Sequence, residues 1–169
     1  MPGALVKNLR RSRVAGSTTI QSILAAEGLS SQVREYPEGT RTAADAAAAI
    51  GCALGQIVKS LIFVSGAATP LLVLVSGSNV VDEEKLQALM REPVRRASAS
   101  EVRAFTGQAI GGVAPVGHPG AIRTLVDPDL LTHSTVWAAA GTPRAVFGIS
   151  PADLVRITHG ELSAISAQP

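Results

Sequence analysis

A single lysine, Lys59, lies in the segment 58–64, whose other residues are apolar apart from Ser60. The alternation of side chains along a strand puts Lys59 on the same face as Leu61 and Phe63, in a row expected to face the core. If the end of this strand opens into a pocket, a fixed cation there can bind a phosphate, a ribose hydroxyl or an ester carbonyl. The alternative is that the aliphatic stem lies along apolar surface and the ammonium group reaches water.

A second candidate is the loop formed by residues 111–120, which contains four glycines and two prolines. Glycines let backbone N–H groups approach a ligand closely, and prolines restrict the conformations of the loop. The segment can therefore form an oxyanion hole or a phosphate-binding nest, although an ordinary turn-rich connection has the same composition. It is neither a P-loop nor a dinucleotide-binding GxGxxG motif.

Side-chain nucleophiles and metal ligands have little support in this sequence. His118 ends the glycine-rich loop and is a candidate for proton transfer or hydrogen bonding, but a lone loop histidine is often merely exposed. Cys52, the single cysteine, lies in an apolar stretch typical of a buried thiol, and no Cys/His cluster has zinc-ligand spacing. Because GxSxG and HExxH motifs are also absent, a hydrolase built on this chain would use water as its nucleophile.

Local signals predict the helices and strands that must position these groups. Helices are expected at 18–27, 42–50, 82–90 and 98–106 and after Ser150, with caps supplied by Ser17 or Thr18, Thr42, Asp82, Ser98 and Ser150. A short extended segment at 33–36, a hairpin of strands 58–65 and 71–76, and strands 122–126, 136–140 and 144–149 are also expected. This order, with two hairpins and no strict βαβ alternation, predicts a single α+β domain with a mixed sheet.

Composition and charge limit the classes of protein further. With 46% hydrophobic and 17% charged residues and only strand-length apolar runs, the chain is expected to be soluble and cytoplasmic. Aromatic residues make up 3%, too few for a base-stacking surface. Residues 1–16 form a basic tail, interpreted as a disordered extension or an RNA-binding arm, that carries Lys7, Arg10, Arg11 and Arg13.

Several segments together resemble the YbaK/prolyl-tRNA-synthetase-associated editing domains. The resemblance runs from about Ile20 to the final helix, in matching order and spacing. Residues 111–115 match the GxxxP loop of that family, and Lys59 matches its active-site lysine. The other matching segments are Thr42, the string Gln56-Ile57-Val58-Lys59-Ser60-Leu61, Thr106-Gly107, and Ala139-Ala140-Gly141-Thr142-Pro143.

The resemblance implies a mixed, barrel-like sheet flanked by helices and a freestanding deacylase for tRNA mischarged with alanine, cysteine, serine or threonine, potentially on tRNA-Pro. The partners would be the mischarged tRNA and potentially a synthetase, with no cofactor, metal, membrane or DNA. A catalytically silent module that binds a tRNA end or nucleotide, and a hydrolase of another small ester or amide, remain alternatives. The resemblance assigns catalysis to Lys59, Gly111, Gly112 and Pro115, and substrate binding to Thr42, Ser60, Val113, Ala114, Gly117, His118, Gly141 and Thr142.

Overall fold

A computed structural model describes residues 16–40 and 42–169. The expectation of a disordered basic tail at 1–16 therefore falls almost entirely outside the described residues, and Gly16 already serves as the N-cap of the first helix. The α-helices are α1 (Ser17–Ala26), α2 (Ala43–Ile50), α3 (Glu83–Met90), α4 (Ala99–Thr106) and α5 (Pro151–Thr158), with 3₁₀ turns η1 (Leu54–Gln56) and η2 (Pro128–Thr132).

The strands are divided among three sheets. The largest has the order β5-β2-β3-β6-β9, a second has the order β1-β8-β7, and β10 pairs with β4. The predicted mixed α+β single domain is confirmed, and within the described residues the sheets do not close into a barrel. The strands are β1 (Val33–Glu35), β2 (Val58–Ser65), β3 (Thr69–Ser76), β4 (Val80–Val81), β5 (Val94–Arg96), β6 (Arg123–Val126), β7 (Val136–Ala139), β8 (Ala145–Ile149), β9 (Glu161–Leu162) and β10 (Ser166–Ala167).

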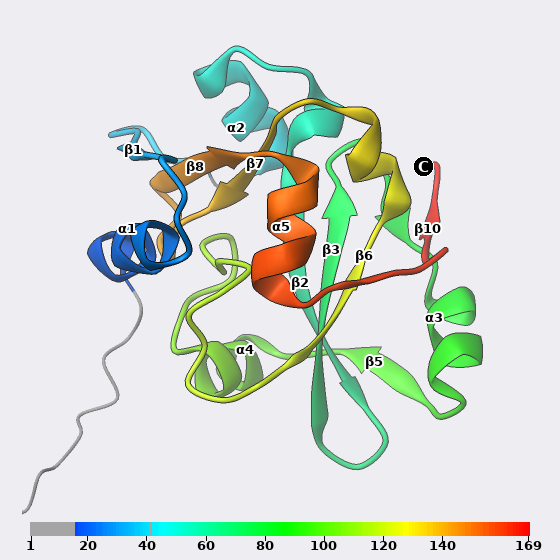
Figure 1. The fold of residues 1–169 in the computed structure, drawn as a ribbon. Helices are drawn as coiled ribbons and strands as arrows, with labels where there is room; N and C mark the ends of the chain where they lie inside the picture. The colour runs from blue at the N-terminus through cyan, green and yellow to red at the C-terminus, as the bar shows by residue number, and fades with distance from the viewer. Residues whose placement is uncertain (1–15, 41) are drawn as a thin grey trace, which may run out of the picture.

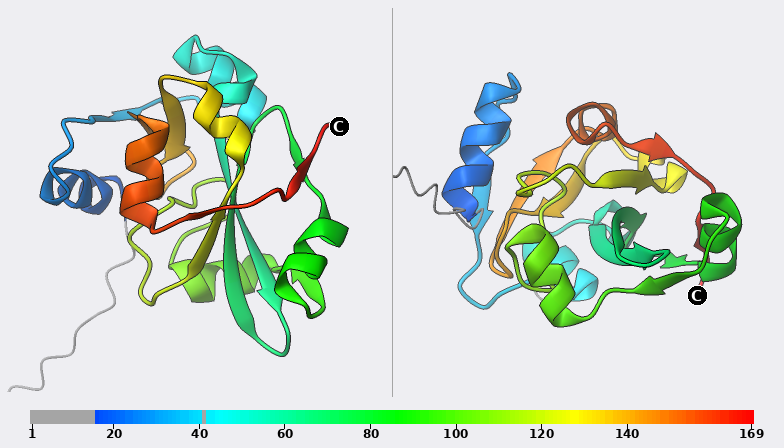
Figure 2. Two further views of the ribbon diagram at one scale, coloured as in Figure 1. Left: turned by 45° about the vertical axis from the view of Figure 1, so that its right-hand side comes forward. Right: turned by 90° about the horizontal axis from the view of Figure 1, so that it is seen from below.

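The long β2–β3 hairpin lies at the centre of the molecule, with the three-stranded sheet and α1 on one side and α3 on the other (Figure 1). The two further views keep α1 and α3 at opposite sides (Figure 2). β2 pairs with β3 along its whole length, and β3 pairs with β6 in parallel. The sheet is therefore mixed, as the sequence predicts.

The edge of β2 that faces away from β3 is paired with other strands over only part of its length. β5 covers that edge over Phe63–Ser65, and at the opposite end Ile57 forms a bridge with Trp137 of β7. No strand in the described part of the chain pairs with this edge between these points. Part of a strand at the centre of the molecule thus remains a free edge.

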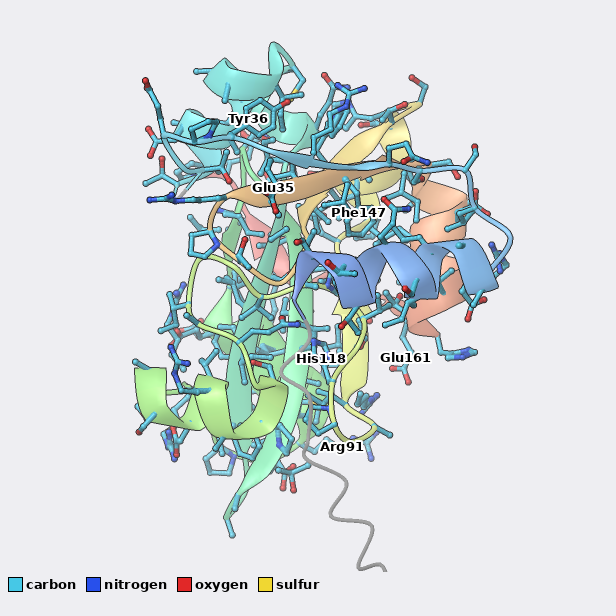
Figure 3. The ribbon with its side chains drawn as sticks, turned by 90° about the vertical axis from the view of Figure 1, so that its left-hand side faces the viewer. Glu35, Tyr36, Arg91, His118, Phe147 and Glu161 are labelled. Carbon is cyan, nitrogen blue, oxygen red and sulfur yellow. The ribbon has the colours of Figure 1, made fainter. Side chains whose placement is uncertain are left out.

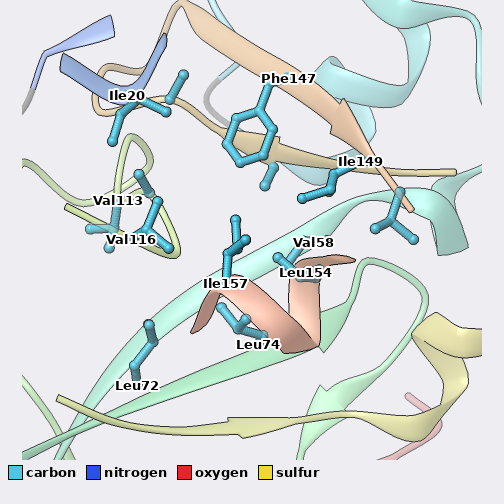
Figure 4. Packing of buried hydrophobic residues seen from close by; sticks show 14 of the residues in the cluster. Ile20, Val58, Leu72, Leu74, Val113, Val116, Phe147, Ile149, Leu154 and Ile157 are labelled. Atoms are coloured by element: carbon cyan, nitrogen blue, oxygen red, sulfur yellow. The ribbon is translucent and has the colours of Figure 1, made fainter. Parts of the chain in front are cut away.

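Two apolar clusters cover the opposite faces of the β2–β3 hairpin. Val58 and Ile62 belong to the larger one, which also holds Ile20, Phe147 and Leu154. In Figure 4 the loop residues Val113 and Val116 lie beside Ile20, so the glycine-rich loop is part of this core. Phe63 and Leu61 face the second cluster, on the side of α3.

Most of the expected helix caps are present. The side chain of Thr42 accepts from Asp45 N–H, and Ser98 and Glu101 form the capping box of α4. Ser150 caps α5 with Pro151 as its first residue. The expected cap of α1 is wrong, because Ser17 is already helical and Gly16 is the N-cap, without a side-chain bond. No helix within the described residues is long and apolar enough to span a bilayer.

Candidate functional site

A cavity of about 310 Å³ lies along the free edge of β2. It extends between β5 at one end and β7 at the other, and α2, α4 and the glycine-rich loop complete its walls. Because successive side chains of β2 point to opposite faces, the cavity reaches both faces of the strand. Its lining includes Thr40, Thr42, Ala46, Ile57, Val58, Lys59, Ser60, Leu61, Ile62, Arg96, Ala97, Val102, Ile110, Gly111, Val113, Trp137, Ala139 and Val146.

Lys59 occupies the face of β2 that also carries Leu61 and Phe63, as the sequence predicts. Its ammonium group donates to the backbone carbonyl of Asn79, in the turn after β3. Partial burial lowers the pKa of Lys59, and the positive charge of Arg96 lowers it further, while the negative charge of Asp127 opposes both effects. Lys59 is therefore a tethered cation at the cavity wall.

A buried carboxylate, Asp127, supports the turn that holds Lys59. It is fully buried, and it accepts hydrogen bonds from Ser76 N–H at 3.1 Å and from the Asn79 side-chain amide at 2.9 Å. It also accepts from Asp129 N–H at 3.0 Å and from the Ser166 hydroxyl at 3.2 Å. A buried carboxylate needs such donors to offset its desolvation. Asp127 thus fixes the turn whose carbonyl binds Lys59.

Arg96 is a second cation of the cavity. It lies opposite Phe63 in the β2–β5 register, and its guanidinium carbon lies over that ring, 5.6 Å from the centroid. Glu83 approaches Arg96 at 3.6 Å, with both side chains at least half exposed. Such an exposed pair is worth about 0.2–1 kcal/mol, so Arg96 remains available to an anionic ligand.

The free edge of β2 presents backbone groups as well as side chains. The carbonyl of Ile62 accepts from Ala97 N–H across this edge at 3.0 Å. Peptide groups alternate between the two edges of a strand, so those of Ser60 point toward the same free edge. On the other edge of β2, Leu74 is the partner of Ser60 in the register, but its carbonyl accepts from the N–H of Asp127, directly after β6, rather than from β2.

Ser60 is a hydroxyl of the cavity without an activating base. Its Oγ is buried and has no hydrogen-bond partner among the described residues. Lys59 cannot serve it, because adjacent strand residues point to opposite faces. None of the described residues that line the cavity is a His, Cys, Asp or Glu. A covalent mechanism through Ser60 therefore has no general base in this arrangement.

The glycine-rich loop uses alternate N–H groups for its own structure. Gly112 N–H donates to the Ala109 carbonyl at 3.0 Å, and Ala114 N–H donates to the Gln108 side chain at 2.7 Å. In the described part of the chain, the N–H groups of Gly111 and Val113 have no hydrogen-bond partner. Both of these residues line the cavity. Two backbone N–H groups without a partner in the described residues therefore belong to the cavity wall.

Gly112 has a packing role in this arrangement. A Cβ built on it would lie 2.6 Å from the carbonyl carbon of Thr142 and 2.8 Å from the nitrogen of Pro143. Real Cβ atoms do not approach backbone atoms this closely, so only glycine lets the loop rest on the β7–β8 turn. Gly141, which has a φ of 96°, shapes that turn.

The structure divides the residues predicted from the sequence into two groups. Lys59, Gly111, Thr42, Ser60 and Val113 line the cavity. The others lie outside its lining and shape the loop or its support: Gly112, Ala114, Pro115, Gly117, His118, Gly141 and Thr142.

His118 illustrates the second group. Its Nε2 is 2.8 Å from the Ala114 carbonyl, and burial lowers its pKa while this hydrogen bond opposes the shift. His118 lies below α1 in Figure 3, on the face of the molecule that carries the loop. With Pro115 and Gly117 it lines a separate surface depression next to the end of α5.

Sequence reasoning missed Arg96, Asn79 and Gln108. Arg96 and its neighbour Arg95 are equivalent in sequence, and the pairing of β5 with β2 distinguishes them. Asn79 contacts Lys59 through its backbone carbonyl, which any residue type supplies. Gln108 directly follows the Thr106-Gly107 pair that matches the editing domains, and this proximity was an available signal.

Comparison with known proteins agrees with this geometry. Residues 37–157 match the family described as the aminoacyl-tRNA editing domain. Protein YwhH of Bacillus subtilis is 30% identical over 130 residues, which cover 77% of this chain and 83% of YwhH. A solved structure described as a candidate trans-editing enzyme for prolyl tRNA synthetase has a TM-score of 0.84 at 43% identity, covering 89% of this chain and 96% of its own.

Two other relatives differ in the share of their own length that matches this chain. The candidate Cys-tRNA(Pro)/Cys-tRNA(Cys) deacylase EbsC of Enterococcus faecalis is 23% identical over 79% of this chain and 82% of EbsC. A proline–tRNA ligase of Nitratidesulfovibrio vulgaris is 30% identical over 73% of this chain, but over just 21% of the ligase. The matched family region contains the free edge of β2, Lys59 and the whole glycine-rich loop. This chain therefore belongs to the aminoacyl-tRNA editing domain family.

Proposed function

We propose that this protein hydrolyses the ester bond of a tRNA mischarged with a small amino acid. The observation that carries the proposal is the meeting of Lys59 with the unpartnered N–H groups of Gly111 and Val113 at one cavity. A cation and two backbone donors are what an ester linked to a nucleotide requires, since its carbonyl oxygen gains negative charge during hydrolysis.

The proposed substrate orientation follows from the two sides of the β2 edge. On one side the wall is apolar, with Val102 and Val113, and it would accept a small side chain. Lys59 and Arg96 on the other side would bind the ribose and phosphate of the terminal nucleotide. The ester would then cross the free edge beside Ser60, whose peptide groups can bind it.

In the proposed reaction, water attacks the ester carbonyl carbon. The N–H groups of Gly111 and Val113 stabilise the negative charge that develops on the carbonyl oxygen. The carbon–oxygen bond to the ribose then breaks, and the ribose oxygen takes up a proton, giving the free amino acid and the uncharged tRNA. Water is the proposed nucleophile because Ser60 has no base beside it.

The small-amino-acid class is alanine, cysteine, serine or threonine, with tRNA-Pro as the acceptor to test first. This choice is supported by the names of the relatives, which refer to prolyl-tRNA synthetase and to Cys-tRNA(Pro). Editing by a separate pocket is useful because one methylene group gives a synthetase about 1–3 kcal/mol of discrimination. A synthetase that presents the tRNA is a proposed partner.

The deciding experiment measures deacylation of a panel of aminoacyl-tRNAs by the native protein and by Lys59→Ala. Loss of a charge-assisted contact of about 1.5–3 kcal/mol should lower kcat/KM roughly 10- to 100-fold. Lys85→Ala is the matched control, because exposed Lys85 binds the Ser166 carbonyl outside the cavity. If the native protein binds charged tRNA yet every ester decays as in buffer, the chain is a binding module and the proposal fails.

A further inference from the structure

The peptide of Ala114 is held from both sides by side chains that do not line the cavity. Its N–H donates to the Gln108 Oε1 at 2.7 Å, and its carbonyl oxygen lies 2.8 Å from the His118 Nε2. Ala114 itself is fully buried. Both backbone groups of the residue next to Val113 therefore have fixed partners.

Gln108 is itself held firmly. Its side chain is almost completely buried, and its N–H donates to the Thr106 hydroxyl at 3.0 Å. That hydroxyl donates in turn to the Val102 carbonyl at 2.7 Å, inside α4. Gly107, with a φ of 72°, ends the helix just before Gln108. A chain of hydrogen bonds thus connects α4 to the loop through the Gln108 side chain.

We propose that Gln108 and His118 are positioning residues, which fix the Ala114 peptide and so keep the N–H groups of Gly111 and Val113 directed to the ester carbonyl oxygen. Val113 and Val116 also hold this segment by apolar packing, but the hydrogen bond from the Gly112 N–H to Ala109 fixes its first turn alone. This inference rests on the proposed ester hydrolysis, because it assigns the residues that hold the oxyanion donors in place.

The physical reason is the cost of leaving a buried N–H without a partner. Loss of the Gln108 acceptor would leave the Ala114 N–H unsatisfied, at a cost of about 1–3 kcal/mol, so the loop would turn to find another acceptor. Rotation of one peptide moves its neighbours, Val113 first. A displacement of roughly 1 Å at a reacting group can cost about 100-fold in rate.

The test compares Gln108→Leu and His118→Phe with the conservative variant His118→Gln, which retains a donor. We expect each of the first two to lower kcat for the cleaved aminoacyl-tRNA roughly 10- to 100-fold with KM nearly unchanged. His118→Gln should recover most of the loss seen in His118→Phe. In the double variant, the loss of kcat should be much smaller than the product of the two single losses, because both side chains act on one peptide.

The control Thr158→Val distinguishes an effect on positioning from a general loss of stability. It removes a hydrogen bond to the Leu154 carbonyl in α5, away from the cavity. This control should lower the unfolding temperature without lowering kcat. If Gln108→Leu and His118→Phe keep the native kcat, or if KM rises while kcat stays, the positioning role is wrong although the deacylase function stands.

A second measurement does not depend on turnover. Amide hydrogen exchange and amide chemical shifts of Ala114, Gly111 and Val113 report the loop directly. Gln108→Leu should accelerate exchange at Ala114 and shift the Gly111 and Val113 signals, whereas Thr158→Val should leave all three unchanged. Unchanged signals in Gln108→Leu would overturn the inference, and a native protein without deacylase activity would instead overturn the proposed function.

Discussion

Individual side chains at the cavity differ sharply in how much the surrounding structure restricts them. Lys59 is tied to the Asn79 carbonyl, and this turn is fixed by the buried Asp127. Arg96 has no comparable anchor, because its contacts are one exposed carboxylate and one aromatic ring. The two cations should therefore contribute differently, with Lys59 positioning the substrate near the ester and Arg96 strengthening binding.

The proposed role of Arg96 predicts that Arg96→Ala raises KM for aminoacyl-tRNA with little change in kcat. Loss of one phosphate contact should raise KM roughly tenfold and make its dependence on salt concentration shallower. Steady-state deacylation at several salt concentrations measures both effects. The matched control is Arg95→Ala: Arg95 is paired with Glu101 and does not line the cavity. Equal effects of the two substitutions would contradict a specific contact.

His118 allows a prediction about pH. Burial lowers its pKa in the folded protein, so the folded state binds this proton less readily than the unfolded chain, whose histidine pKa is about 6.5. The stability contributed by neutral His118 is therefore fully present above about pH 6.5 and is lost as the pH falls toward the lower, folded-state pKa. Denaturation between pH 8 and 5 should show a shallower decline in stability in His118→Gln than in the native protein.

Among the structural elements, the loop and the β7–β8 turn act as one unit because Gly112 brings their backbones into contact. Gly112→Ala should destabilise the protein by about 1–3 kcal/mol, since the added methyl group meets backbone atoms that cannot rotate away. Gly120→Ala is the control in the same loop, because nothing lies within 4 Å of the added Cβ. Denaturant unfolding of both variants measures the difference, and equal stability would show that the turn moves aside.

Helix ends and the main hairpin could be predicted from the sequence because their signals are local. Thr42, Ser98 and Ser150 each bond to the N–H group three residues later, inside the same segment. The short strands β5, β9 and β10 were missed because each is defined by a partner distant in the chain, such as β6 for β9. The site followed the same rule: Lys59 and Gly111 carried a recognisable motif, whereas Arg96 and Gln108 acquire their positions from strand register and loop packing.

At the scale of the whole molecule, the described residues that line the cavity lie between Thr40 and Val146, and α1 begins at Ser17. Deletion of residues 1–13 is therefore expected to leave kcat at saturating tRNA within about twofold of the full chain, because the ester-binding groups are retained. A rise in KM that disappears at high salt would identify the tail as an RNA-binding arm. A collapse of kcat would show that the tail contributes to the site itself.

The free edge of β2 has a consequence for the behaviour of the protein in solution. An unpaired strand edge is normally a template for another strand and hence for aggregation. Here the gap between β5 and β7 is walled by α2, α4 and the glycine-rich loop, so the groups that can receive a substrate are shielded from the edge strand of a second molecule. Substitutions that destabilise those walls would thus lower the solubility of the protein as well as its selectivity for substrates.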